Sequence, residues 1–156
     1  MITENISFPP MNQTQEYNYT KAQDKLPFWI TDYAGKKSRV MLLRLPNIAH
    51  PEDAHFHPTQ IYIDASIAPL IQKLNDKGYI TTHCCSGLEE DHEEIDYGYI
   101  TFVGKCPLSV EGALILPFKN GEGIYIVTES NQVKKEFWAA AYAQTLRLDA
   151  ATTLFN

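Results

Sequence analysis

The stretch "DASIAPLIQKLNDKGYITTHC" (64–84) decides the fold class, because one clear helix pattern runs directly into one clear strand pattern. Its apolar residues recur at the spacing of a single helical face, at Ile67, Leu70, Ile71 and Leu74. We expect Asp64 or Ser66 to cap the start of this helix, and Gly78 to take the left-handed position after its last turn. Residues 79–84 then alternate and are rich in β-branched side chains, which predicts a strand.

Segments on both sides of this stretch predict further strands. Residues 38–45 are almost continuously apolar and predict an interior strand that Pro46 closes, while "PFWI" (27–30) is expected to anchor the preceding chain in a core. The remaining strand patterns lie at 60–63, 97–103, 113–116 and 123–129. Asn120 and Gly121 are typical of a tight turn, so the last two strands are expected to form a hairpin.

A second helix follows Ser130 or Asn131, either of which is expected to cap it. Its predicted apolar face consists of Val133, Phe137, Trp138, Ala141 and Leu146. This order of elements predicts an α+β fold, with two main helices packed against a mostly antiparallel sheet. We assign residues 27–156 to this single domain, and residues 1–26, which are rich in Asn, Gln, Thr and Tyr, to a loosely ordered arm.

Composition limits the classes of partner. The 156 residues carry a formal net charge of -6 and no basic cluster longer than a pair, which argues against nucleic acid. Three cysteines are too few for a disulfide framework and predict a reduced, cytoplasmic compartment. No leader has the pattern of a secretion signal and no apolar run approaches the length of a membrane span, so we expect a soluble protein without a membrane partner.

The histidines and cysteines form a first candidate site, because all of them lie between residues 50 and 106. His55 and His57 stand two apart on an extended segment and would project the same way, as paired metal ligands often do. A nearby cysteine and a third histidine would complete a tetrahedral shell of the kind that zinc favours: Cys84 or Cys85, and His83 or His92. The candidate metal ligands are therefore His55, His57, Cys84 and His92. The alternative is that the histidines are loop residues and the cysteines pack in the core.

The turn "CCSG" (84–87) is the second candidate site. Gly87 has no Cβ, so the backbone there can turn sharply and approach a ligand closely, and successive amides can cup an anionic group. We predict a small-molecule pocket with the following residues around it: Cys85, Ser86 and Gly87 at the floor, and His57 or His55 at the rim. The alternative is a plain turn at the end of a buried strand.

Several reaction classes lack their motifs. A phosphatase loop of the Cys-x5-Arg type requires arginine where Asp91 stands six residues past Cys85, and the acidic residues between them would raise a thiol pKa. The Gly-x-Ser-x-Gly motif of serine hydrolases is absent. The acidic run 89–96 lacks the spacing of an EF-hand loop and is expected to be a solvated loop.

The segment "PLIQKLNDKGYITTHCCSG" (69–87), followed by "YITF" (99–102), resembles an LNxxGYxTxxCCSG pattern of small uncharacterised bacterial and phage-borne proteins. The resemblance covers about residues 61–103 and implies the order helix, strand, turn and strand, without an activity. More distantly, "TTHCCSG" resembles the Ser-Ser-Cys-Ser-Gly-Arg turn of the tRNA wybutosine-synthesis methyltransferases, which use S-adenosylmethionine on a modified guanosine. That resemblance implies a pocket lined by Cys85, Ser86 and Gly87, although Leu88 stands where the family has arginine.

The sequence thus supports three hypotheses of function. The first is a small cytoplasmic protein with a small-molecule pocket at the CCSG turn. The second is a metal-dependent or S-adenosylmethionine-dependent enzyme that uses the same histidines and cysteines. The third is a non-catalytic protein-interaction module, suggested by Tyr17, Tyr19 and Tyr33, because tyrosine is enriched at interfaces.

Overall fold

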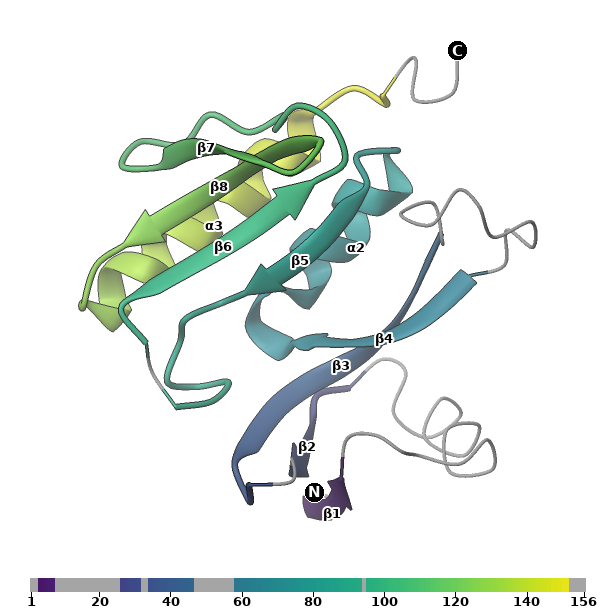
Figure 1. The fold of residues 1–156 in the computed structure, drawn as a ribbon, viewed down its shortest axis with the longest axis vertical. Coiled ribbons are helices and arrows are strands. Elements are labelled where there is room, and N and C mark those ends of the chain that lie inside the picture. The colour runs from purple at the N-terminus through teal and green to yellow at the C-terminus, as the bar shows by residue number, and fades with distance from the viewer. Residues whose placement is uncertain (1–2, 8–25, 32–33, 47–57, 94, 152–156) are drawn as a thin grey trace.

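The computed structural model describes residues 3–7, 26–31, 34–46, 58–93 and 95–151. These residues form two mostly antiparallel sheets and two α-helices, which confirms the predicted α+β fold class (Figure 1). Residues of three hypotheses lie outside the described part of the chain: His55 and His57, Tyr17, Tyr19 and Tyr33, and most of the arm 1–26. Those hypotheses stay predictions.

The first sheet, sheet A, contains four strands in the order β1-β2-β3-β4. Their bounds are Thr3–Ser7 for β1, Phe28–Thr31 for β2, Lys37–Pro46 for β3 and Pro58–Asp64 for β4. β1, which the sequence patterns do not predict, is parallel to β2, and the other neighbours are antiparallel. β3 is the expected interior strand. Its alternate side chains join two clusters: Val40 and Leu42 pack with Phe28 and Ile30, whereas Leu43 and Leu45 belong to the main core.

The second sheet, sheet B, is antiparallel throughout, in the order β5-β6-β8-β7. Its bounds are Thr81–Cys85 for β5, Tyr97–Phe102 for β6, Leu114–Phe118 for β7 and Gly121–Val127 for β8. The expected β7–β8 hairpin is confirmed, but its turn residues are Lys119 and Asn120, because Phe118 pairs with Gly121. Gly121 lies inside the strand, where a Cβ would clash with the carbonyl oxygen of Phe102.

The helix predicted between β4 and β5 consists of a 3-10 turn, η1 (Ala65–Ile67), and α2 (Ala68–Asp76). Its apolar stripe is buried as predicted, at Ile67, Leu70, Ile71 and Leu74. Gly78 has a φ of 92°, the left-handed conformation expected after a helix. Asp64 takes the predicted N-cap position of η1, but the capping bond is missing, because neither η1 nor α2 receives a side-chain cap bond. The side chains of Asp64 and Ser66 instead bond to residues that follow β5.

The last helix, α3 (Asn131–Arg147), is capped by Ser130, whose Oγ accepts a hydrogen bond from the Val133 N–H. Its buried stripe consists of Lys134, Phe137, Trp138, Ala141 and Thr145. The predicted places of Val133 and Leu146 on that face are wrong, because both are nearly half exposed. Lys134 can be buried since its Nζ donates to the Ile95 carbonyl at 2.5 Å. Of the helices described, none is long and apolar enough to cross a bilayer.

The two sheets present their edge strands β4 and β5 to each other. Both strands run in the same direction and are joined through η1 and α2, so they form a β-α-β unit (Figure 1). No ladder joins these two described strands, since β4 pairs with β3 and β5 pairs with β6. Ligands of α/β folds bind at the carboxyl ends of parallel strands, where neighbouring strands separate. The last residues of these two strands are Asp64 and Cys85.

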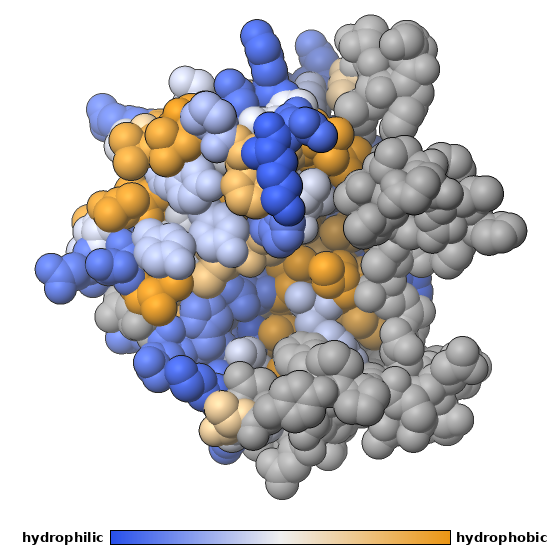
Figure 2. Space-filling view, in the orientation of Figure 1, coloured by the Kyte–Doolittle hydropathy of each residue, from blue (hydrophilic) through white to orange (hydrophobic). Residues whose placement is uncertain are grey.

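Sheet B has one covered face and one open face among the described elements. α2 and α3 both lie behind the sheet in Figure 1. On the open face, toward the viewer, Tyr99 stacks between Tyr97 and Tyr125, with ring centroids 5.9 and 5.7 Å apart. Figure 2 shows hydrophobic side chains over the β7–β8 hairpin, where Leu114 and Leu116 are 49% and 45% exposed.

A buried carboxylate joins the two sheets. Asp91, in the loop between β5 and β6, has no solvent exposure. It accepts hydrogen bonds from the Arg39 guanidinium of β3 at 3.2 Å, the Ser66 hydroxyl of η1 at 3.0 Å and the Ser86 hydroxyl at 2.7 Å. Burial raises the pKa of the Asp91 carboxyl, and the bonds from Ser86 and Ser66 oppose that rise. The expectation of a solvated acidic run 89–96 is therefore wrong for Asp91.

We expect Asp91→Ala to lower the free energy of unfolding by at least about 3 kcal/mol, because it deprives a part-buried guanidinium and two hydroxyls of their shared acceptor. Urea unfolding followed by circular dichroism measures the change. Asp96→Ala is the matched control, since Asp96 is exposed, and we expect a change within about 0.5 kcal/mol. Equal stability losses for the two variants would contradict the joining role of Asp91.

Candidate functional site

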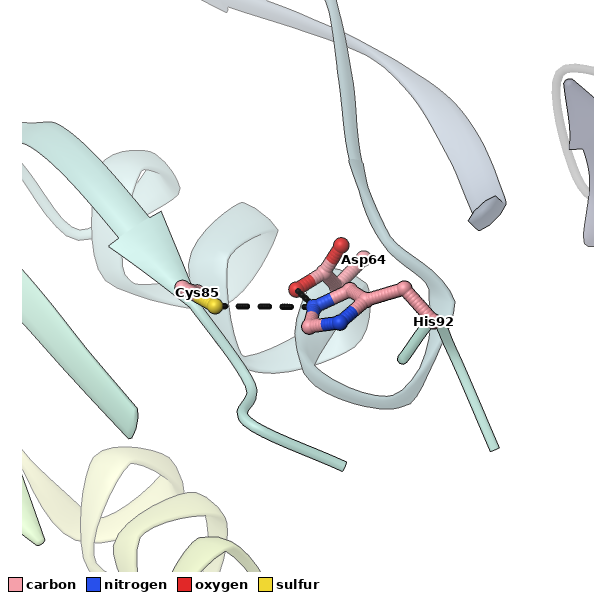
Figure 3. Close-up of side chains that lie close together, drawn as sticks. All are labelled: Asp64, Cys85 and His92. Carbon is pink, nitrogen blue, oxygen red and sulfur yellow. Dashed lines mark hydrogen bonds and ion pairs between the residues drawn. The ribbon is translucent and has the colours of Figure 1, made fainter. Parts of the chain in front are cut away.

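Three side chains with metal-ligating atoms converge where β4 and β5 end. Asp64 closes β4, Cys85 closes β5, and His92 lies in the loop that follows β5. His92 Nε2 lies 3.0 Å from Asp64 Oδ2 and 3.5 Å from Cys85 Sγ. One ligand atom from each of these residues lies within 4.8 Å of the other two. Figure 3 shows the Asp64 carboxylate and the Cys85 sulfur both directed at the same edge of the imidazole.

Backbone contacts of the β5–β6 loop hold this arrangement. The Ser86 N–H donates to Asp64 Oδ2 at 2.8 Å, which fastens the end of β4 to the end of β5. The N–H groups of Asp91 and His92 both donate to the Leu88 carbonyl, so the loop closes as a tight turn. The buried Asp91 side chain therefore fixes the backbone from which His92 projects.

Both nitrogens of the His92 ring face acceptors. Nδ1 lies 2.8 Å from the Glu93 carbonyl oxygen, which accepts only, so Nδ1 carries a hydrogen. Nε2 faces the Asp64 carboxylate, so in the metal-free protein it carries a second hydrogen. The Asp64 carboxylate raises the pKa of His92 from 6.5 to about 11; the Cys85 sulfur and the Glu93 carbonyl add to the rise, and burial opposes it. The cluster thus holds an imidazolium ion.

The same geometry suits a metal ion in place of the Nε2 proton. Histidines that bind metals usually donate their other ring N–H to a carbonyl or carboxylate, as the His92 Nδ1–H does to Glu93. Ligand atoms around tetrahedral zinc lie roughly 3.3 to 3.6 Å apart, given bonds of about 2.0 to 2.3 Å. The distance of 3.5 Å between Nε2 and Sγ matches this, and the distance of 3.0 Å between Nε2 and Oδ2 needs only a small opening.

A cleft between the two sheets reaches Asp64, one of the three residues of this cluster. Its volume is about 230 Å³, and Asp64 is one of its lining residues. The walls from sheet A are apolar, namely Leu45, Ile61 and Ile63, with Tyr62 beside them. The opposite wall comes from β5 and β6 and includes Thr81, Thr82, His83, Cys84 and Tyr99. The cleft has the size for a ligand smaller than a drug-sized molecule.

The structure brings some of the residues predicted as ligands together and leaves others apart. His92 and Cys85 both belong to the cluster; Cys85 was predicted at a pocket floor and as an alternative metal ligand to Cys84. Cys84 lies outside the cluster, because adjacent side chains of a strand point to opposite faces. It packs against the main core, where burial raises the pKa of its thiol far above the usual value. Asp64 was missed as a site residue, although its place at the end of a strand before a helix was a usable signal.

Ser86 and Gly87, predicted at the floor of a pocket, are both buried. Ser86 accepts a hydrogen bond from the Trp138 indole N–H through its carbonyl at 2.8 Å, and from the Leu88 N–H through its hydroxyl at 3.2 Å. Gly87 has a φ of 73°, and a Cβ there would clash with the carbonyl of Tyr97. These residues position Asp64 and the loop, and their backbone is enclosed by protein.

We expect Gly87→Ala to destabilise the protein by more than about 3 kcal/mol, because it adds a backbone clash to the strain of a positive φ. Gly104→Ala is the matched control. Gly104 has a φ of 87°, and no atom of the described residues lies within 4 Å of the place that an added methyl group would take, so only the strain of about 1 kcal/mol is expected. Thermal and urea unfolding measure both. Similar losses in the two variants would refute the close approach of Tyr97.

In chelator-treated protein we expect His92 to stay protonated from pH 5 to 8, because its pKa is raised to about 11. The folded-state pKa exceeds the unfolded value of about 6.5. The ion pair therefore stabilises the fold fully from pH 5 to about 6.5, and this contribution is lost as the pH rises through about 11. Proton NMR of the ring hydrogens measures the titration, with His92→Gln to assign the signal. A midpoint near pH 6.5 would contradict the contacts of the two ring nitrogens with the Glu93 carbonyl and the Asp64 carboxylate.

The chain was also compared with known proteins. No protein-family model, no curated protein and no solved structure matches it. The resemblances of the CCSG motif therefore stay predictions, and function is inferred from the geometry of Asp64, Cys85 and His92.

Proposed function

We propose that this protein binds a divalent transition-metal ion, with zinc as the best fit, through Asp64 Oδ2, Cys85 Sγ and His92 Nε2. The observation that carries the proposal is the convergence of one ligand atom from each of these residues within 4.8 Å of the other two. A second support is the Glu93 carbonyl, which takes the Nδ1 hydrogen and leaves Nε2 as the ligand atom.

The ligand set selects among metal ions by chemical type. A thiolate and an imidazole favour zinc and related transition metals, whereas calcium and magnesium prefer shells of oxygen ligands. The cluster is also screened from solvent, since the side chains of His92 and Asp64 are 18% and 15% exposed. Low exposure strengthens the attraction between the ion and its two anionic ligands.

Three protein ligands leave a fourth position for water or a small molecule, which is the arrangement of catalytic zinc sites. Asp64 also lines the cleft between β4 and β5, so a molecule in that cleft lies beside one of the three ligands. A metal ion beside the cleft unites two hypotheses from the sequence, a small-molecule pocket and a metal-dependent enzyme. At the open position an ion acts as a Lewis acid or lowers the pKa of a bound water.

We expect about one zinc ion per chain in protein purified without nickel or chelators, measured by elemental analysis and by calorimetric titration of the chelator-treated protein. Cys85→Ser and His92→Ala remove ligands and are expected to weaken zinc binding at least about 100-fold. Cys106→Ser is the matched control, because the Cys106 thiol bonds to the Leu108 carbonyl away from the cluster. Unchanged zinc affinity in both ligand variants, or no zinc binding by the wild type, would overturn the proposal.

A further inference from the structure

The open face of sheet B connects the cluster to an aromatic row. Cys85 lies opposite Tyr99, Tyr99 opposite Tyr125, and Tyr125 opposite Leu114 in the strand register. Directly opposed residues of antiparallel strands share one face of the sheet and lie about 5 Å apart at Cβ. Tyr99 is therefore the first aromatic residue beyond Cys85, and it also lines the cleft together with Asp64.

The Tyr99 side chain is held in place by its neighbours, and its polar end has no partner among the described residues. Its ring is stacked between those of Tyr97 and Tyr125. Within the described part of the chain, its hydroxyl makes no hydrogen bond, whereas the neighbouring Thr82 and Thr101 hydroxyls bond to each other at 2.6 Å. Because Tyr99 lines the cleft and its hydroxyl has no partner among the described residues, this hydroxyl can donate to a bound molecule.

The charges around the cleft indicate which molecules it suits. Neither Lys nor Arg is found among the described residues that line it. Arg39, on the neighbouring β3, is committed to Asp91 and Ser66. A divalent ion with one carboxylate and one thiolate ligand is neutral overall, so the metal centre offers an anion in the cleft no net positive charge. Leu45, Ile61 and Ile63 offer an apolar wall instead.

Resting on the proposed metal site, we infer that the cleft binds a small neutral carbonyl compound, an amide or ester with a short apolar group. Its carbonyl oxygen takes the fourth position on the ion and accepts a hydrogen bond from the Tyr99 hydroxyl. Its apolar group packs against Ile61 and Ile63. The ion acts on the carbonyl oxygen as a Lewis acid and the phenol donates a hydrogen bond to it. Together they withdraw electrons from the carbonyl carbon, as an oxyanion hole does.

The test uses the full-length protein loaded with Co²⁺, whose visible spectrum reports a change of ligand at the ion. Isobutyramide is the neutral probe; isobutyrate, nearly identical in shape, and inorganic phosphate are the anionic comparisons. We expect isobutyramide to perturb the spectrum saturably and to bind more tightly than either anion. Tyr99→Phe is expected to weaken its binding about tenfold, the loss of one hydrogen bond to a polarised oxygen.

Tyr125→Phe is the matched control, because Tyr125 is the next residue of the same aromatic row and does not line the cleft. It should bind isobutyramide as the wild type does, and both variants should keep the zinc affinity of the wild type. Tighter binding of isobutyrate or phosphate, no binding of isobutyramide, or equal binding by Tyr99→Phe would overturn the inference while leaving the metal site standing. Absence of a metal-loaded form would instead overturn the proposed function.

Discussion

The buried carboxylate of Asp91 is the interaction on which the rest of the structure depends. A carboxylate without solvent exposure is tolerated only where a positive charge and hydrogen-bond donors surround it. Its donors come from β3, from η1 and from the turn after β5, so sheet A, the helical connection and sheet B meet at one point. A shift of either sheet would leave a donor unpaired in the interior. The imidazole of His92, the next residue, is therefore placed by the same contacts that join the sheets.

The candidate metal site follows from a β-α-β unit whose strands are fastened at one end only. The bond from the Ser86 N–H to Asp64 closes the carboxyl ends of β4 and β5, and the cleft lies between the two strands beyond it. An ion bound there would sit at the closed end, with a small molecule beside it. His92 is held at both ring nitrogens, so binding an ion requires little further ordering of its side chain.

Features with a local periodic signal were predictable from the sequence, and those that depend on distant partners were not. The apolar stripe of α2, the hairpin of β7 and β8 and the interior position of β3 all follow from short-range patterns. Asp64 looks like a helix cap in its local context, because its real partners, Ser86 and His92, lie 22 and 28 residues away.

The burial of Lys134 depends on the Ile95 carbonyl, 39 residues away, and the burial of Asp91 depends on Arg39, 52 residues away. From their charge alone, Lys134 and Asp91 would both be expected on the surface.

The turn from Ser86 to His92 also constrains how this protein can diverge. The Ser86 hydroxyl meets the side chain of Asp91 five positions later and the backbone of Leu88 between them, so an insertion or deletion inside the turn would separate these partners. The exposed Glu89 carries no such restriction on its side chain. Distant descendants of the same ancestor would then share a fixed interval, a Ser-Gly pair followed by Asp-His, after the strands around it had lost all recognisable identity.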